Sequence, residues 1–279
     1  MDYNISYQMR KWGQVMKNPW KKEWEYLQKK EKSFLRRRNK EGFSFFNDKL
    51  EQVVPPKLQH TLEMAFGKAF RLIFEKGNPV IEKSFSKEKR KSDYDIRSYA
   101  ASVKKNRASL RAFRRSSSAA TAKNVAVSGV EGVGFGILGI GIPDIPVFVG
   151  MILKSVYEIA LAFGFPYESR EERYFILCLI RASLERSKRL QNLDGQINTL
   201  MTKHFTVTEE ALNQQIDATA AALSRELLYL KFIQGIPIVG VVGGLSDVHY
   251  LHVITDYAKL KYQRRFLYQR KQNANTEQQ

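Results

Sequence analysis

The sequence is poor in the residues on which disulfide-rich secreted proteins and common enzyme classes depend. Among 279 residues there is one cysteine, Cys178, so a disulfide framework is excluded and a reducing compartment is expected. Cys178 lies in the apolar run 174–180, which favours a buried structural thiol over a nucleophile. The sequence contains neither a G-K-[ST] phosphate-binding loop nor an HExxH zinc motif. These absences predict a chain without a catalytic motif, and we expect no cofactor.

The first residues also lack the apolar segment of a secretory signal. Residues 1–18 are aromatic and polar, so we expect no signal peptide and a protein that starts in the cytosol. Any contact with a membrane would then come from the cytoplasmic side and from later segments. We therefore predict a cytoplasmic protein that is peripheral to the inner leaflet of the cell membrane.

Acidic residues are scarce relative to basic ones. The chain has 46 Lys and Arg against 28 Asp and Glu, which gives a net charge of +18. The basic excess gathers in residues 1–50, 82–115 and 259–271, outside the apolar centre of the chain. Such a distribution attracts polyanions, either nucleic acid or an anionic lipid leaflet, the latter by about 1 kcal/mol per basic residue near the surface.

An uninterrupted membrane-spanning run is missing as well. Residues 132–153 contain one charged residue, Asp144, and a run of this length could cross a bilayer. However, Pro143 and Pro146 divide the run into two halves of about ten residues, each too short to span. We therefore predict two short helices joined at 142–146, with Asp144 capping the second.

Small residues in the first half of this run indicate close helix packing. Gly132 and Gly136 are spaced by four, so one helix face lacks large side chains and another helix can approach closely. A charge in such a setting is either a helix cap or a functional carboxylate, and Glu131 has no evident capping role. A second stretch rich in glycine, with one proline, occurs at 235–247. We therefore predict two Gly/Pro-containing apolar helical hairpins, at 125–164 and 232–270.

Residues 1–47 are expected to form an amphipathic helical arm. Pro19 suits the first turn of a helix, and Trp20, Trp24 and Leu27 follow at helical spacing. Two interpretations stay open: the tryptophan stripe packs on the domain's own core, or it inserts into a membrane interface. In the second interpretation the arm contacts lipid through Trp12, Trp20, Trp24, Lys21, Lys22, Lys29, Lys30, Arg36, Arg37 and Arg38.

The rest of the chain has helical periodicity too. Apolar residues from Leu58 to Ile73 recur every three or four residues, and the pattern stops at 77–79. Residues 82–118 are either a basic helix or an exposed connection. Further helices are expected at 172–189, from Thr208 onwards and at 246–270, with a linker at 194–206. We predict an all-α multi-helix bundle made of the arm, a helical domain at 48–271 and a disordered tail at 272–279.

One cluster of side chains could form a metal site. His249, His252 and Asp256 fall at i, i+3 and i+7 of a predicted helix and so share one face. Two imidazoles and a carboxylate are suitable ligands for zinc or iron. The alternative is an ordinary polar helix face, which we favour because no established metal motif accompanies the cluster.

Two further binding functions are weighed against the same sequence. Glycines at 134–139 have GxGxxG-like spacing, but the preceding strand is meagre and Pro143 interrupts the following helix, so close packing is favoured over nucleotide binding. Basic residues interleaved with aromatics at 1–50 and 257–271 could bind nucleic acid. No helix-turn-helix, zinc-finger or RNP-like motif accompanies them, so nucleic acid is the less favoured partner.

Several separated blocks resemble the EcsC family of bacterial proteins, and they span roughly residues 50–268. The family takes its name from an operon that also encodes an ABC transporter. The resemblance implies a helical fold and a membrane-linked context, without a particular reaction. Phe163 and Asp247 depart from the family pattern, in which Tyr and Asn are common. The matching blocks are residues 53–65, Ala119 to Pro146, Gly164, Glu172 to Tyr174, residues 236–244, and Ala258 with Tyr262 and Arg265.

Together these observations predict a non-enzymatic protein at an anionic membrane surface, accessory to a membrane transporter or an envelope process. The first alternative is a nucleic-acid-binding protein. The second is a metal-dependent enzyme that uses His249, His252 and Asp256.

Overall fold

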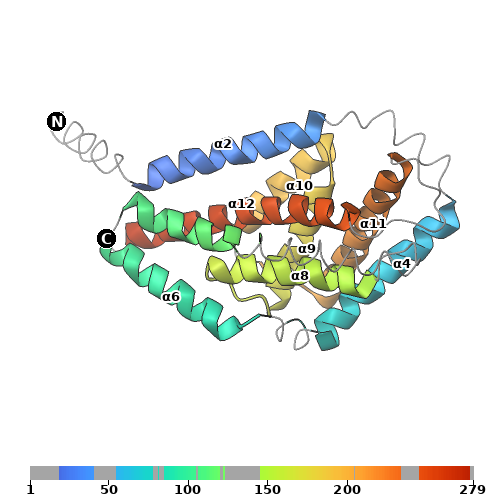
Figure 1. Cartoon of the computed structure of the whole chain (residues 1–279), viewed down its shortest axis with the longest axis horizontal. Coiled ribbons are helices and arrows are strands. Elements are labelled where there is room, and N and C mark those ends of the chain that lie inside the picture. The colour runs from blue at the N-terminus through green and yellow to red at the C-terminus, as the bar shows by residue number, and fades with distance from the viewer. Residues whose placement is uncertain are drawn as a thin grey trace.

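The computed structural model describes residues 19–40, 55–77, 81, 85–104, 106–119, 122, 145–203, 205–233 and 245–276. Within these ranges the regular structure is helical throughout and contains no strand, so the all-α fold class is confirmed. Residues 107–119 form a further helix beside the labelled elements. The labelled elements (Figure 1) are α2 (Pro19–Lys40), α4 (Pro56–Leu72), the π-helical turn η1 (Ile73–Gly77), α6 (Lys87–Lys104), α8 (Ile145–Ala162), α9 (Arg170–Leu184), α10 (Ser187–Leu200), α11 (Glu209–Ile233) and α12 (Leu245–Thr276).

Local sequence signals place several helix starts. Pro19 and Pro56 are the first residues of α2 and α4, where the missing N–H of proline has no intrahelical acceptor to lose. Ser169 caps α9 by accepting the N–H of Glu172, 3.1 Å away, as expected for the pattern S-x-x-E. The hydroxyl of Thr208 likewise accepts the N–H of Ala211 at the start of α11, where the sequence predicted a helix.

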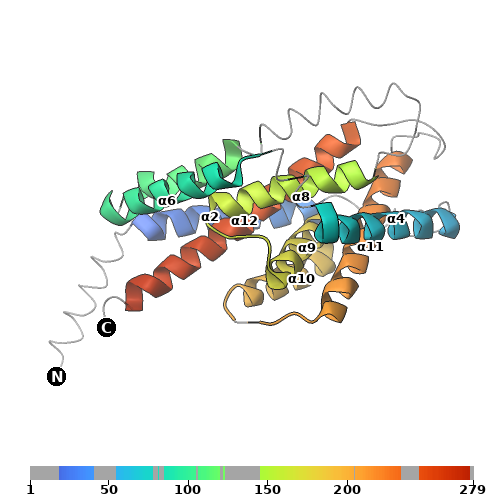
Figure 2. The same cartoon turned by 90° about the horizontal axis from the view of Figure 1, so that it is seen from below.

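Four helices follow one another across the molecule in the order α2, α12, α8 and α6. Helix α2 packs on α12, α12 packs on α8, and α8 packs on α6. Figure 1 shows this order from top to bottom, and in Figure 2 α6 lies nearest the viewer with α2 behind α12. Helix α9 packs on both α12 and α11, and α11 packs on α4. Helices α2 and α6 therefore form two outer faces on opposite sides of the bundle.

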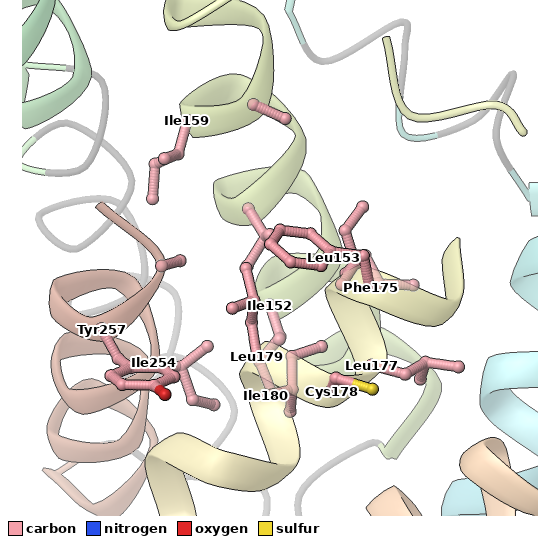
Figure 3. Close-up of a cluster of buried hydrophobic side chains, with 14 of the residues drawn as sticks. Ile152, Leu153, Ile159, Phe175, Leu177, Cys178, Leu179, Ile180, Ile254 and Tyr257 are labelled. Carbon is pink, nitrogen blue, oxygen red and sulfur yellow. The ribbon is translucent and has the colours of Figure 1, made fainter. Parts of the chain in front are cut away.

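The centre of the core lies between α8, α9 and α12. Figure 3 shows Ile152 and Leu153 of α8 against Leu179 of α9, with Ile254 and Tyr257 of α12 on the other side. All five side chains are buried, and burial of each large apolar side chain contributes roughly 1.5–3 kcal/mol of stability. Helix α8 is long and apolar enough to cross a membrane, with a mean hydropathy of 1.7. However, 72% of that helix is buried within the protein, so in this fold α8 is a core helix.

A glycine ends α8 and lets α6 approach. Gly164 has a φ of +85°, and the N–H of Phe165 donates to the carbonyl of Ala160 at 2.9 Å, which is the hydrogen bond of a Schellman cap. A β-carbon at Gly164 would collide with the ring of Tyr94 from α6. Glycine is therefore required here both for the backbone conformation and for the contact between α6 and the end of α8.

Some expected boundaries were wrong. The predicted linker at 194–206 is helical as far as Leu200, because α10 buries Leu190 and Ile197 on one face. Residues 272–276 were predicted to belong to a disordered tail, but they are helical, because α12 continues to Thr276. The helix expected at 172–189 ends at Leu184, and α10 begins at Ser187. Of the two alternatives for residues 82–118, the helical one is correct for the described residues, which form helices at 87–104 and 107–119.

Some predicted features lie outside the described residues. These include both Gly/Pro-rich turns of the predicted hairpins. They also include Trp12, Glu131, Gly132, Gly136 and Asp144. Helix α8 begins at Ile145, with Pro146 as its second residue, which agrees with the predicted start of the second short helix.

Candidate functional site

Helix α2 has two faces of opposite character. The inner face buries Leu27 and Phe34 against α12, and the Phe34 ring lies 5.1 Å from the ring of Tyr257. The same inner face carries two buried carboxylates, Glu23 and Glu31. Buried carboxylates are costly unless basic groups pair with them, so the partners of these two residues determine how α2 is held.

Glu31 belongs to a buried ionic cluster that joins α2, α10 and α12. Its carboxylate lies 3.1 Å from Lys261 Nζ and 2.7 Å from Arg264 Nη1. Lys261 is 0% exposed and also contacts Asp194 Oδ1 at 2.7 Å. The hydroxyl of Tyr257 donates to the same Asp194 oxygen at 2.8 Å. Burial, together with the adjacent Asp194 carboxylate, raises the pKa of Tyr257 well above its usual range.

Glu23 is held in the same way near the N-terminal end of α2. Arg107 Nε lies 3.3 Å from one carboxylate oxygen, and Arg114 Nε lies 3.2 Å from the other. The side-chain amide of Gln263 on α12 donates to the carboxylate at 3.2 Å. Both arginines come from the helix at 107–119, so Glu23 connects α2 to that helix as well as to α12.

Arg38 was predicted to contact lipid headgroups, and the structure corrects this. Its guanidinium is buried, donates to the carbonyl of Leu184 at 2.7 Å and lies 3.2 Å from the Glu226 carboxylate. Arg186 pairs with the same carboxylate. Arg38 falls on the inner face because it follows Glu31 by seven residues and Phe34 by four. It therefore serves to dock the C-terminal end of α2.

The outer face of α2 is basic. We define the basic face of α2 as its exposed lysines and arginines, and Glu25 is the one acidic residue among the exposed side chains described on this helix. The other two carboxylates of α2, those of Glu23 and Glu31, point inward. Negative charge therefore lies mainly on the inner side of the helix and positive charge on its outer side. The basic face consists of Lys21, Lys22, Lys29, Lys30, Lys32, Arg36 and Arg37. Six of these seven are among the residues predicted to contact lipid, and Lys32 is an additional exposed cation.

The tryptophans of α2 do not project from the basic face. Trp20 and Trp24 are partly buried and pack against the hydrophobic core. The guanidinium of Arg264 lies 4.9 Å from the centre of the Trp24 ring, so this ring is covered by a cation from α12. Of the two interpretations of the tryptophan stripe, packing on the domain's own core is therefore the one that the structure favours.

Three residues from the blocks that resemble the EcsC family meet in the core. Arg265 of α12 forms two hydrogen bonds to the Glu172 carboxylate of α9, at 2.6 and 2.9 Å. The Tyr262 hydroxyl donates to the same carboxylate at 2.6 Å, and burial beside this carboxylate raises the pKa of Tyr262 well above its usual range. The guanidinium also stacks on Phe165 and Phe175, with ring centres 4.3 and 4.9 Å away. These contacts hold α12 against α9, and both oxygens of the Glu172 carboxylate accept hydrogen bonds.

The predicted metal ligands are not assembled into a site. His249 and His252 are exposed, and the Asp256 carboxylate pairs with Lys259 at 2.8 Å. Across the part of the chain that the structure describes, no three His, Cys, Asp or Glu side chains are placed to hold a metal ion. The cluster therefore matches the alternative interpretation, a polar face of α12.

The lone thiol is unsuited to nucleophilic chemistry. Cys178 is a buried residue of α9 within the hydrophobic core (Figure 3). Burial raises its pKa to about 12, because the thiolate loses its hydration there. The thiol is therefore protonated at neutral pH, as the apolar run around it predicted.

Sequence patterns did not reveal the buried ionic clusters. Glu31, Asp194 and Lys261 are distant in the chain, and each alone reads as an ordinary surface charge. The one available signal was helical phase, because Glu23 and Glu31 share the face of Leu27 on α2. That phase indicates that the two carboxylates face the core, although it does not identify their partners.

Comparisons with known proteins agree with the resemblance found in the sequence. No curated protein and no solved structure matches the chain. The model of the EcsC protein family matches residues 21–267. This match begins well before residue 50 and includes nearly all of α2, which agrees with the buried ion pairs that join α2 to the bundle. The chain belongs to the EcsC protein family.

Proposed function

We propose that this chain is a non-enzymatic protein that adsorbs to anionic membrane surfaces through the basic face of α2. The observation that carries the proposal is the segregation of charge on α2. Seven basic side chains are exposed on one face, whereas Glu23 and Glu31 are buried on the other and are neutralised by cations of the bundle. The outward field of α2 is therefore positive although the helix contains three glutamates.

The spacing of the basic face suits a flat, charged surface. Lys22, Lys29 and Arg36 follow one another at intervals of seven residues, so they form a row along the outer side of the helix. At 1.5 Å per residue, successive members of this row lie about 10.5 Å apart. Each basic group near an anionic leaflet contributes about 1 kcal/mol, so the whole face supplies several kcal/mol of attraction.

The mode of contact that we propose is electrostatic adsorption. The apolar side of α2 is occupied by the bundle, and Trp24 is covered by Arg264, so the docked helix offers lipid charge and little apolar area. Attraction between exposed charges is screened over about 8 Å at physiological ionic strength. Binding is therefore expected to weaken strongly with added salt.

The location and partners follow from the same proposal. An anionic surface available to a protein in the cytosol is the inner leaflet of the cell membrane, where a membrane transporter or envelope apparatus would be the protein partner. Three observations support a binding role over a catalytic one. The Glu172 carboxylate is paired with Arg265, the Cys178 thiol is protonated, and Asp256 pairs with Lys259 and does not join the two histidines in a metal site.

Vesicle flotation tests the proposal. The purified full-length chain is mixed with neutral vesicles or with vesicles containing anionic lipid, at low and at high salt. We expect strong flotation with the anionic vesicles at low salt, and we expect high salt to weaken it markedly. Failure to float with anionic vesicles at low salt would refute the proposal. Tight, salt-sensitive binding to duplex or single-stranded nucleic acid in that case would assign the basic face to phosphate backbones instead.

A further inference from the structure

Helix α6 exposes an apolar stripe that the basic face of α2 does not explain. Ile96, Tyr99 and Val103 are 68%, 73% and 63% exposed, more than any other large apolar side chain in the described part of the protein. They are spaced i, i+3 and i+7, so they lie along one side of the helix. We call these three residues the α6 stripe. Scattered exposed apolar residues are ordinary, but three in a row along one helix face indicate a contact surface.

The stripe faces away from the bundle. The opposite side of α6 packs inward: Ala101 is buried, and Tyr94 lies against Gly164 at the end of α8. Arg90 on that side lies 3.3 Å from Glu158 of α8. Because these inner residues fall on the opposite side of α6 from the stripe, the stripe points away from α8.

Charged side chains border the stripe on both sides. Lys89, Lys91 and Lys104 are exposed, and Glu88 and Asp95 offset part of their charge. An aromatic and two aliphatic side chains flanked by lysines form the composition of a helix that lies in a membrane interface. The small excess of positive charge means that such a contact would depend more on apolar burial than on charge.

The size of the stripe favours lipid over a protein partner. Helix α6 has 18 residues and is therefore about 27 Å long, and it presents a convex strip about 10 Å wide. A stable interface between proteins, including one between two copies of this chain, buries about 800 Å² on each partner. One convex strip supplies much less than this. A lipid surface has no such minimum, because each inserted side chain contributes its own transfer free energy.

The two outer helices cannot contact one flat membrane together. Helices α2 and α6 lie at opposite ends of the order α2, α12, α8, α6 (Figures 1 and 2), and each exposes the side that points away from that stack. We propose that the α6 stripe is a second lipid-binding surface, so that one molecule bridges two membrane surfaces. This inference rests on the proposed function of α2. The α2 contact is electrostatic, and the α6 contact is apolar.

Vesicle clustering tests the bridging. Anionic vesicles are mixed with the full chain at low salt, and clustering is followed by dynamic light scattering, with flotation measured in parallel. The test variant is Ile96→Ser, Tyr99→Ser, Val103→Ser. The matched control is Met64→Ser, Leu72→Ser, Val147→Ser, which removes three exposed apolar side chains from α4 and α8. We expect the wild type and the control to cluster vesicles, and the α6 variant to float normally with clustering reduced at least fivefold.

The outcomes separate this inference from the proposed function. Flotation of the wild type without clustering would overturn the bridging and leave the α2 proposal standing. Clustering by the α6 variant that equals that of the wild type would have the same consequence. Loss of flotation in the wild type would overturn both. The mass of each protein in solution is measured by light scattering as well. A wild-type dimer that becomes a monomer in the α6 variant would assign the stripe to a second copy of the chain and overturn the lipid assignment.

Discussion

Helices α2 and α8 are the most instructive pair of regions in the molecule. Helix α8 has the length and hydropathy of a membrane span, yet it lies in the centre of the fold and contacts other helices over most of its surface. Helix α2 is dominated by lysine, arginine and glutamate, yet it buries Leu27 and Phe34 and forms one outer face of the bundle. Apolar content alone therefore does not identify which helices lie at the surface of the fold.

The two helices differ in how their apolar and charged side chains are distributed around the helix axis. In α8 the second half is buried on every side, so no face remains for solvent or lipid. In α2 acidic residues fall on the buried face and basic residues on the exposed one, so the helix is polarised in charge as well as in hydropathy. A helix of this kind is held by ion pairs on the inside and presents a positive surface outside.

The largest effect is expected from breaking the ionic attachment of α2. Glu31→Ala removes the carboxylate that pairs with Lys261 and Arg264, and loss of one partner from a buried ion pair costs about 3–5 kcal/mol of unfolding free energy. Urea denaturation followed by circular dichroism measures the change. Glu25→Ala, on the exposed face of the same helix, is the matched control and should stay within about 0.5 kcal/mol of wild type. Equal small effects for both variants would contradict the docked position of α2.

A similar pair of substitutions tests the core position of α8. Ile152→Ala leaves a cavity between α8, α9 and α12, and should lower the unfolding free energy by about 2–5 kcal/mol. Val147→Ala on the same helix removes atoms from a side chain that is 41% exposed, and should cost far less. Both are measured by urea denaturation in the absence of lipid. A negligible effect of Ile152→Ala would indicate that α8 does not form the core in solution.

Alkaline pH is expected to have a smaller effect on stability, through two buried tyrosines of α12. The raised pKa values of Tyr257 and Tyr262 mean that both phenols stay protonated in the folded chain above pH 10, where an unfolded tyrosine ionises. Their contribution to stability is complete below about pH 10 and is lost as the pH rises through the folded-state values. The urea concentration at the unfolding midpoint should therefore fall as the pH rises above about 10.

Substitution of single phenols checks the source of this pH dependence. Tyr257→Phe should make the fall shallower, whereas Tyr99→Phe, which removes an exposed phenol, serves as the control. The unfolding midpoint of each variant is followed across the same alkaline range. An unchanged slope in Tyr257→Phe would show that the buried phenol is not the source.

The sequence predicted the features that depend on local pattern. The helical class, the start of α2 at Pro19, the stripe of α4 and the start of a helix near Thr208 follow from apolar spacing and proline placement, which act within a few residues. The predicted linker at 194–206 was wrong because Gly195 and several polar side chains weaken the helical signal. In the structure, Leu190 and Ile197 supply the tertiary contacts that stabilise α10.

The candidate site was predicted only in part, for a related reason. Composition identified the exposed lysines and arginines of α2, but it could not separate Arg38 from Arg36 and Arg37. That separation depends on which side of α2 meets the rest of the bundle. Arg38 is buried by Leu184 and Glu226, which lie 146 and 188 residues away in the chain. Contacts at such separation leave no mark in a local sequence pattern.

One matched pair of variants tests whether the basic face of α2 binds anionic membranes. Lys22→Glu, Lys29→Glu, Arg36→Glu reverses the central row of that face. The control, Lys57→Glu, Lys68→Glu, Lys76→Glu, makes the same change of net charge at exposed lysines of α4 and η1. Flotation with anionic vesicles is measured over a range of lipid concentrations, after circular dichroism has verified that both variants are folded.

We expect the α2 variant to lose at least about 3 kcal/mol of binding free energy, more than 100-fold in affinity, because three attractive charges become repulsive. The control should bind close to the wild-type level, apart from a small reduction from its lower net charge. Equal losses in the two variants would mean that net charge, and not the basic face of α2, governs the interaction. Wild-type binding by the α2 variant would show that the basic face of α2 is not the membrane contact.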